Sequence, residues 1–325
     1  MTKLANAQAA STKPQAADVQ HFITVAETPQ DVLTRIFDES FRLREERNAG
    51  KANEPILKGQ TLAMIFEKPS LRTNVSFQQA MFELGGTCIP MVSEQVGLGK
   101  RESPADVARV LSGMVHGIMA RVFEHHKLVE LAAHSTIPVI NALSDFSHPC
   151  QALADAMTMM DEFGRDLKGR TLAFVGDGNN VAHSLAVMCG RLGMNFILAS
   201  PPAYEIKQEV ADTIMADCPE LNMELMQDPI DAVRYADAVY ADTWISMGQE
   251  TEAAIRKSAF EGFQINDKLL SKAPEHCIVL HCLPAYRGIE ITDSAMDGPR
   301  SRVFPQAHNR LHAQKGLLAV LMGGK

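Results

Sequence analysis

The sequence lacks long hydrophobic runs and an excess of positive charge, and it has few cysteines. No apolar stretch approaches the ~20 residues needed to span a bilayer, so a transmembrane protein is not expected. The formal net charge of −8 argues against nonspecific binding to nucleic acid or to an acidic membrane surface. The six cysteines are spread from Cys88 to Cys282. That spacing is not typical of a disulfide framework and favours a reduced, cytoplasmic compartment.

Length and composition predict two folded domains. The 325 residues correspond to two domains of ~150 residues each. With 46% hydrophobic and 22% charged residues, the chain can bury a substantial core. Residues 1–18 differ, because they are rich in Ala, Gln, Ser and Thr and lack the apolar core of a secretory signal. The first 17 residues also lack Asp and Glu, as a transit peptide does, but they have no Arg. We therefore interpret 1–18 as a flexible tail.

Short apolar runs alternate with helical patterns through both halves of the chain. The predicted strands are 61–66, 87–92, 117–123 and 137–141 in the first half, and 170–175, 195–199, 238–241 and 277–280 in the second. Helices are expected from residue 28, over 73–84, from 103, near 147–163 and over 180–192. This alternation predicts an α/β fold with two domains, each a parallel sheet flanked by helices. Ligands of such sheets bind beyond the carboxyl ends of the strands, here in a cleft between the domains.

The loop after the first predicted strand has the residues of an anion site. Ser70, Leu71, Arg72 and Thr73 stand at the start of a helix. Hydroxyls, free backbone N–H groups and an arginine fork at this position suit a phosphate. Arg121 ends another predicted strand and would point into the same cleft. The residues alone also fit a capped helix with a solvated Arg72 and a surface ion pair for Arg121.

A second candidate site opens the helix near 147–163. His148 and Gln151 lie three residues apart, so they share one helical face. Both side chains can hold a carbonyl or an amide, and an imidazole donor there would polarise a carbonyl. A histidine that only caps the helix is the alternative interpretation.

Two loops of the second half invite a ligand interpretation. Gly176-Asp177-Gly178-Asn179-Asn180 resembles a dinucleotide fingerprint, but Val181 replaces its third glycine, and no clear acidic residue ends the next strand. A nicotinamide cofactor is therefore not expected. The loop 242–250 holds the only tryptophan, Trp244, near Asp242, whose carboxylate could bind a substrate amino group. A hinge loop anchored by Trp244 is the alternative.

The segment His281-Cys282-Leu283-Pro284 follows the last predicted strand. A cysteine in a polar cleft could be a nucleophile, but that use requires a partner base. Two histidines and two cysteines within 276–282 raise the question of zinc. Strand alternation divides their side chains between two faces, so no metal site is predicted. Arg310, expected just before the final helix, could return to the cleft.

Together these segments resemble one enzyme family. In order and spacing the chain is similar to the ornithine carbamoyltransferases, within the aspartate/ornithine carbamoyltransferase family, over about residues 25–322. The Asp-x-x-x-Ser-Met-Gly loop and the His-Cys-Leu-Pro segment are specific to the ornithine branch. The matching segments are 67–73 (EKPSLRT), 148–155 (HPCQALAD), 176–180 (GDGNN), 242–250 and 281–284 (HCLP).

The resemblance implies an activity and an organisation. Residues 19–152 would bind carbamoyl phosphate and 153–325 the amino acid, with a last helix of about 306–322 packing back on the first domain. The side-chain amine of L-ornithine would attack the carbamoyl carbon directly, giving L-citrulline and phosphate without a metal or organic cofactor. A homotrimer, or a multiple of trimers, with active sites near the subunit interfaces is implied as well.

The resemblance also implies roles for individual residues. Cys282 would position the amine and form no covalent intermediate. The residues implied to act in catalysis are Arg72, His148, Asp242 and Cys282. The residues implied to bind carbamoyl phosphate are Ser70, Leu71, Arg72, Thr73, Arg121, His148, Gln151, Cys282 and Arg310. The residues implied to bind ornithine are Asn180, Asp242, Ser246, Met247, Cys282 and Leu283.

Three positions depart from the family pattern. Its phosphate loop usually reads Ser-Thr-Arg-Thr-Arg, whereas this chain has Leu71 for a threonine and Asn74 for the second arginine. Gly97 stands where the family tends to place a Gln or His that reaches a neighbouring subunit. Each change could weaken carbamoyl-phosphate binding by ~1–3 kcal/mol if a hydrogen-bonding or charged contact is lost. Two alternatives therefore stay open, a sister transferase for putrescine or an acylated ornithine, and a catalytically weak binding homologue.

Overall fold

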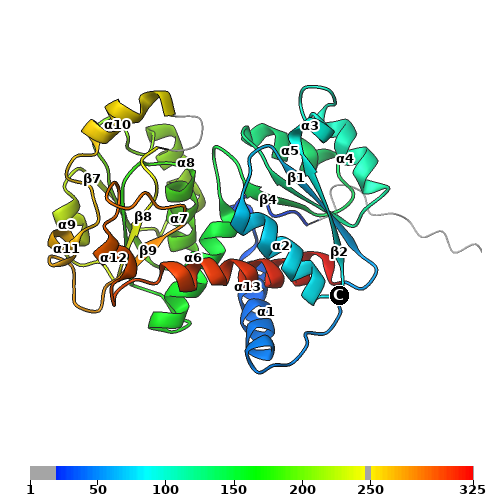
Figure 1. Ribbon diagram of the computed structural model, residues 1–325, viewed down its shortest axis with the longest axis horizontal. Helices are drawn as coiled ribbons and strands as arrows, with labels where there is room; N and C mark the ends of the chain where they lie inside the picture. The colour runs from blue at the N-terminus through cyan, green and yellow to red at the C-terminus, as the bar shows by residue number, and fades with distance from the viewer. Residues whose placement is uncertain (1–19, 246–249, 325) are drawn as a thin grey trace, which may run out of the picture.

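The computed structural model describes residues 20–245 and 250–324, which form two parallel sheets with helices around them (Figure 1). This confirms the predicted α/β fold class. The first sheet has the strand order β2-β1-β3-β4 and the second β7-β6-β5-β8-β9, and every pairing in both sheets is parallel. Among the described residues, no helix combines the length and the apolar character that crossing a membrane would require.

The first half of the chain builds the four-stranded sheet. Its central strand β1 is buried along almost its whole length, as expected for a parallel strand with helices on both faces. The elements are α1 (Gln30–Asn48), β1 (Thr61–Phe66), α2 (Leu71–Glu83), β2 (Thr87–Val92), α3 (Ser93–Val96), α4 (Pro104–Ser112), β3 (Gly117–Arg121), α5 (His125–His134) and β4 (Val139–Leu143).

The second half builds the five-stranded sheet after α6 (Pro149–Phe163), which connects the two sheets. Its last helix, α13, ends the described chain. The elements are β5 (Thr171–Val175), α7 (Asn180–Arg191), β6 (Asn195–Ala199), α8 (Gln208–Asp217), β7 (Met223–Met226), α9 (Pro229–Val233), β8 (Ala238–Ala241), η2 (Glu250–Glu252), α10 (Ala253–Ala259), α11 (Asp267–Leu270), β9 (Ile278–His281), α12 (Asp293–Asp297) and α13 (Val303–Met322).

The predicted elements differ from the structure mainly at their ends. Strands 61–66, 87–92, 195–199 and 238–241 are confirmed with these bounds. The helix expected from residue 73 begins at Leu71, because the Ser70 hydroxyl accepts a hydrogen bond from the Thr73 amide and so caps the helix at residue 70. The final helix begins at Val303 rather than near residue 306. The strand β7 was not predicted, because it is a half-exposed edge strand without a hydrophobic run.

The helices α1, α6 and α13 join the two halves. In Figure 1, α13 runs beneath both sheets, and it packs against α1, α2, α6 and β9. One continuous hydrophobic core contains Leu33 of α1, Leu153 of α6, Leu185 of α7 and Leu317 of α13. Residues of both halves are therefore held by the same buried apolar contacts.

Strand order decides where ligands can bind. In the first sheet the order reverses between β1 and β3, and in the second sheet between β5 and β8. In open parallel sheets these reversals leave a crevice at the carboxyl ends of the strands. The loops that leave the four strands are those that begin at Glu67, Val122, Gly176 and Asp242, and all four lie in or next to segments singled out in the sequence.

Candidate active site

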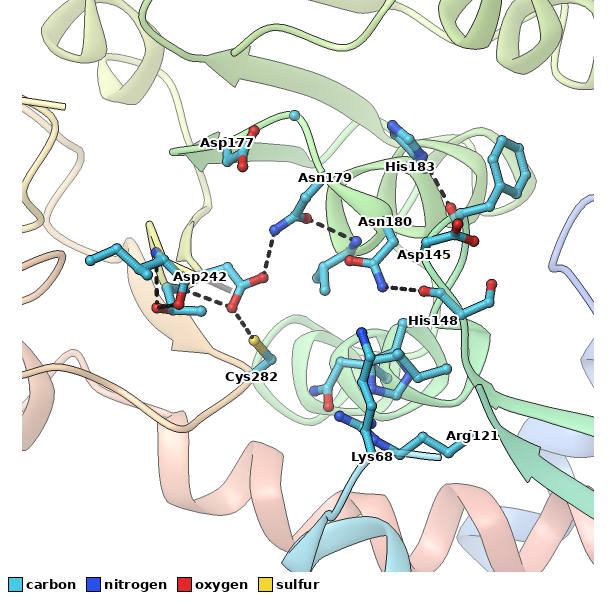
Figure 2. A pocket seen from close by; sticks show the side chains of 18 of the residues that line it. Lys68, Arg121, Asp145, His148, Asp177, Asn179, Asn180, His183, Asp242 and Cys282 are labelled. Atoms are coloured by element: carbon cyan, nitrogen blue, oxygen red, sulfur yellow. Dashed lines mark hydrogen bonds between the residues drawn. The ribbon is translucent and has the colours of Figure 1, made fainter. Parts of the chain in front are cut away.

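A cleft of about 1480 Å³ opens at the carboxyl ends of both sheets (Figure 2). Its walls include the loops after β1 and β4 on one side and the loops after β5, β8 and β9 on the other. Among the predicted site residues within the described part of the chain, those that line it are Ser70, Leu71, Arg72, Arg121, His148, Gln151, Asn180, Asp242, Cys282, Leu283 and Arg310.

The start of α2 presents the Ser70 hydroxyl and the Arg72 guanidinium to the cleft, whereas the predicted phosphate residue Thr73 is not among the residues that line it. The Ser70 hydroxyl lies 3.0 Å from the Thr73 Oγ1 and caps the helix. Thr73 is buried, and its Oγ1 accepts a hydrogen bond from Arg310 at 3.2 Å. Arg72 donates to the backbone carbonyl of Leu283, which belongs to the opposite wall. Leu71 is 75% exposed at the cleft edge, so its side chain makes little contact with the protein.

Four cationic side chains converge on this end of the cleft: Lys68, Arg72, Arg121 and Arg310. None of them forms an ion pair with a carboxylate of the described residues. Burial lowers the pKa of Arg121 to about 10, and the charges of Arg310 and Arg72 contribute to that shift. Burial also lowers the pKa of Lys68, with repulsion from Arg121. Unneutralised positive charge of this density favours an anionic ligand.

His148 supplies a neutral ring to the same end. It lies at the N-cap of α6, where its backbone N–H donates to the Ser184 hydroxyl at 2.8 Å. Burial lowers the pKa of the imidazole well below its ordinary value, and Arg310 and Arg121 lower it further. Its Nδ1 is buried and has no hydrogen-bond partner among the residues that the structure describes. A neutral imidazole keeps one N–H, which can be donated to a carbonyl oxygen of a ligand.

Gln151 and Arg310 meet across 159 positions of sequence. The Arg310 guanidinium donates to the Gln151 Oε1 at 2.8 Å, and it enters the cleft from within α13, not from before the final helix. The Gln151 Nε2 in turn donates to the Asp155 carboxylate at 2.8 Å. Both side chains are thus held at fixed positions in the cleft wall.

The opposite wall is centred on a carboxylate. Asp242 follows β8, and its Oδ1 accepts hydrogen bonds from the Cys282 thiol at 2.9 Å and from the Thr243 amide at 2.7 Å. Its Oδ2 accepts from the Asn179 Nδ2 at 2.7 Å (Figure 2). Burial raises the pKa of the Cys282 thiol well above its ordinary value, and the Asp242 charge adds to this. The thiol therefore stays protonated and acts as a donor, not as a nucleophile.

The loop after β5 places two asparagines at the cleft. Asn180, the predicted residue, donates to the Ser144 carbonyl at 2.6 Å. Asn179 caps α7 through its Oδ1 and holds Asp242 with its amide nitrogen. Sequence reasoning did not single out Asn179. Its position directly before a helical pattern was the available signal, because an N-cap side chain lies at the open end of the helix.

The tryptophan anchors the start of its loop. Trp244 is buried and stacks on Phe260, with ring centroids 5.3 Å apart. The Arg256 guanidinium donates to the Trp244 carbonyl at 3.1 Å and pairs with Asp177 at 2.7 Å. These contacts fix Trp244 two positions after Asp242. The predicted residues Ser246 and Met247 lie outside the described residues.

The positions that depart from the family pattern differ in their relation to the cleft. Asn74 accepts a hydrogen bond from Gln78 at 2.6 Å on α2, and it is not among the residues lining the cleft. Gly97 does not line the cleft either, and it has a φ of 63°, the left-handed conformation that favours glycine. Lys68 does line it, and sequence reasoning gave this residue no role. Within the described residues no group of three His, Cys, Asp or Glu side chains could hold a metal ion.

Comparisons with known proteins agree over both halves. Residues 20–161 match the family described as aspartate/ornithine carbamoyltransferase, carbamoyl-P binding domain, and 168–321 match its Asp/Orn binding domain. The chain is 45% identical to an ornithine carbamoyltransferase of Methanopyrus kandleri over 93% of this chain and 97% of that protein. It is 49% identical to one of Thermococcus kodakarensis, over 83% and 86%. A solved ornithine carbamoyltransferase from Pyrococcus furiosus has a TM-score of 0.90 at 44% identity, covering 94% of this chain and 98% of that one.

Proposed function

The chain belongs to the aspartate/ornithine carbamoyltransferase family, and from this premise we propose how its cleft performs the reaction. The activity is that of an ornithine carbamoyltransferase, which converts carbamoyl phosphate and L-ornithine to L-citrulline and phosphate. The observation that carries the proposal is the convergence of four cations on one wall of the cleft, facing the Asp242–Cys282 pair on the other; none of the four pairs with a carboxylate in the described part of the chain.

The cationic end of the cleft suits carbamoyl phosphate. Arg72 and Arg121, with the hydroxyl of Ser70, would bind the phosphate oxygens, and Lys68 would add charge beside them. As the carbon–oxygen bond to phosphate breaks, negative charge grows on the leaving group. Fixed cations in a partly buried cleft stabilise that charge without reorganising.

The carbamoyl group would lie toward α6 and α13. The neutral His148 N–H and the Arg310 guanidinium are donors that suit its carbonyl oxygen, where negative charge develops during attack. The Gln151 Oε1 is an acceptor that suits its amide N–H groups. These three side chains together would orient the carbamoyl carbon toward the opposite wall.

The opposite wall suits the amino acid. Asp242, held by Cys282 and Asn179, is the carboxylate that would meet an amine. In the proposed reaction the side-chain amine of ornithine enters unprotonated and forms the new carbon–nitrogen bond. It then loses one proton, which the departing phosphate can accept. The predicted ornithine contacts of Asn180, Ser246, Met247 and Leu283 are part of the same proposal.

Exposed apolar side chains support the proposed homotrimer. Leu71, Val75 and Phe82 are exposed along α2, and Ile89 and Val92 are exposed on β2, the edge strand of the first sheet. Clustered apolar residues at a surface are typical of subunit interfaces. A subunit that docked here would lie next to Leu71, at the edge of the cleft.

The proposed substrate can be tested by offering competing amines. Citrulline or its analogue would be measured from carbamoyl phosphate with ornithine, putrescine, N-acetylornithine and lysine in parallel. We expect a strong preference for ornithine. A preference for another amine would assign the chain to a sister transferase, and turnover with none of them would contradict the proposal as a whole.

The phosphate assignment can be tested at Arg72. In Arg72→Ala we expect kcat/KM for carbamoyl phosphate to fall at least ~100-fold, because the guanidinium meets charge that develops in the transition state. Arg109→Ala is the control, since Arg109 is an exposed arginine of α4 that lies outside the cleft wall. Circular dichroism would establish that both variants are folded. A loss of only a few fold in Arg72→Ala would remove this residue from the phosphate site.

A further inference from the structure

One buried carboxylate behind the cleft has no role in the mechanism above. Asp155 of α6 is fully buried, and it is not among the residues that line the cleft. Its Oδ1 accepts hydrogen bonds from the Gln151 Nε2 at 2.8 Å and from the Gln306 Nε2 at 2.6 Å. Its Oδ2 accepts from the Tyr240 hydroxyl at 3.1 Å. Three donors therefore converge on a group that only accepts when ionised.

These contacts determine which way the Gln151 amide faces. A glutamine can present either its NH₂ group or its oxygen in a given direction, and rotation by half a turn exchanges the two. Asp155 lies on one side of Gln151 and accepts, whereas Arg310 lies on the other side and can only donate. The Gln151 nitrogen must therefore face Asp155, and its oxygen must face Arg310 and the cleft. A carbonyl oxygen has two lone pairs, so one remains for a ligand N–H.

We propose that Asp155 is a positioning residue that holds the Gln151 oxygen toward the cleft, so that the site selects an acyl phosphate whose acyl group carries N–H donors. The inference rests on the proposed function and extends it. Carbamoyl phosphate has an NH₂ group where acetyl phosphate has a methyl group of similar size. Only the first can donate to the Gln151 Oε1. If the Gln151 amide turned, its NH₂ group would face the NH₂ group of carbamoyl phosphate. Carbamoyl phosphate would then no longer bind more tightly than acetyl phosphate.

Asp155 also contacts elements of the opposite wall. Loss of those contacts has to be distinguished from a change in the orientation of the Gln151 amide. Gln306, which donates to Asp155, accepts a hydrogen bond from the His281 amide next to Cys282. Tyr240 lies on β8 two residues before Asp242. A loss of these contacts would disturb the cleft for every ligand alike, whereas a turned Gln151 amide affects only a ligand with N–H donors.

The test compares two ligands in Asp155→Asn at a pH of about 8. The new side chain keeps the shape of Asp155, but it can offer its NH₂ group to Gln151 and let that amide turn. Binding of carbamoyl phosphate and of acetyl phosphate would be measured by calorimetry without ornithine, so that no turnover is required. We expect the Kd of carbamoyl phosphate to rise roughly tenfold or more and that of acetyl phosphate to change less than about twofold.

Tyr240→Phe is the matched control, because it removes one hydrogen bond from Asp155 and leaves the acceptor that faces Gln151 in place. Its ratio of the two Kd values should equal that of the unchanged protein. An equal loss for both ligands in Asp155→Asn would show a purely structural role, and no loss for either would show no role. Both results would overturn the inference.

The double variant Gln151→Glu, Asp155→Asn exchanges the two functional groups at constant charge. The new amide then donates, and the new carboxylate again presents an oxygen to Arg310 and the cleft. We expect the preference for carbamoyl over acetyl phosphate to return, and its absence would contradict the inference. The double variant also provides a test of the inference if Asp155→Asn alone does not fold. Because binding is measured apart from turnover, a protein that makes no citrulline but prefers carbamoyl phosphate would contradict only the proposed function.

Discussion

At the scale of single residues, the surroundings of each group decide its protonation state. Burial and three neighbouring arginines keep His148 neutral, while burial and the Asp242 carboxylate keep the Cys282 thiol protonated. Both groups can therefore act as hydrogen-bond donors near neutral pH, and neither serves as a strong base or nucleophile. This fits a reaction in which the substrate amine itself attacks a carbon with a good leaving group.

The first residue-scale prediction concerns the positive charge beside the phosphate site. In Lys68→Met we expect the KM for carbamoyl phosphate to rise roughly tenfold, because a cation that lines the cleft is lost. In Asn74→Arg we expect less than about a twofold change, since Asn74 bonds to Gln78 and does not line the cleft. Steady-state kinetics at saturating ornithine would measure both. Tighter binding in Asn74→Arg would mean that the departure at this position is a true deficit of charge.

The second residue-scale prediction concerns stability and pH. Burial raises the pKa of Asp155 from 3.8 to about 7, so between these values the folded protein holds a proton that the unfolded chain has released. The stabilisation is complete below the unfolded pKa and is lost as the pH rises through about 7.

Urea unfolding at a pH of about 5 and of about 8 would test this shift. We expect the free energy of unfolding of the unchanged protein to fall more over this interval than that of Asp155→Asn, because the variant has no carboxyl group to titrate. Equal pH dependence in the two proteins would mean that the pKa of Asp155 is not raised by burial.

At the scale of elements, the close packing of α13 on α1 joins the two halves. A Cβ on Gly316 would lie 2.5 Å from the Ile36 carbonyl oxygen and 2.6 Å from the Ser40 amide nitrogen, both backbone atoms of α1. Only glycine allows the helices to approach this closely. The neighbouring Lys315 is also buried there, where its ammonium group donates to Asn53 at 2.6 Å and to Glu83.

The element-scale prediction is that Gly316→Ala destabilises the protein. The added methyl group must push α13 away from α1, which we expect to lower the free energy of unfolding by roughly 1–3 kcal/mol. Gly113→Ala at the end of α4 is the control, because its Cβ would meet only the Val110 carbonyl oxygen, at 3.6 Å. Chemical denaturation would measure both variants. If the free energy of unfolding changed equally in both variants, α13 would be able to move away from α1 without loss of stability.

At the scale of the whole molecule, several of the exposed apolar side chains of the first half lie on α2 and β2. Leu71 at the edge of the cleft belongs to this surface, so an assembly formed through it would bring a second subunit next to the carbamoyl-phosphate end. Assembly and catalysis are therefore expected to depend on the same face of the molecule.

The whole-molecule prediction is that Phe82→Glu weakens the assembly. Phe82 is 74% exposed on α2, and a charge buried in an interface is costly unless it is paired. We expect light scattering to give a trimer for the unchanged protein and smaller species for the variant. Tyr235→Glu is the control, because Tyr235 is 77% exposed but follows α9 in the second half. A trimer that persists in Phe82→Glu would place the interface elsewhere.

Local sequence patterns are sufficient to predict the type of most elements and the segments that form the cleft. Apolar runs such as 61–66 and helix starts such as the one expected at residue 103, where Ser103 caps α4, depend on local periodicity and capping, which neighbouring residues specify. Because the carboxyl ends of parallel strands meet at one edge of a sheet, the strand pattern alone assigns the loops with Arg72, His148 and Asp242 to one site.

Which side chains contact one another depends on how distant elements pack together. Arg310 reaches Gln151 across 159 positions because α13 packs along α6, and no local pattern encodes this contact. The same holds for Asn179, which donates to Asp242, whereas the resemblance implied a role, as an ornithine contact, only for its neighbour Asn180. It also holds for the buried Asp155, which accepts from Tyr240. Periodicity describes which face of an element is apolar, whereas contacts between distant elements follow from how the whole chain fills its core.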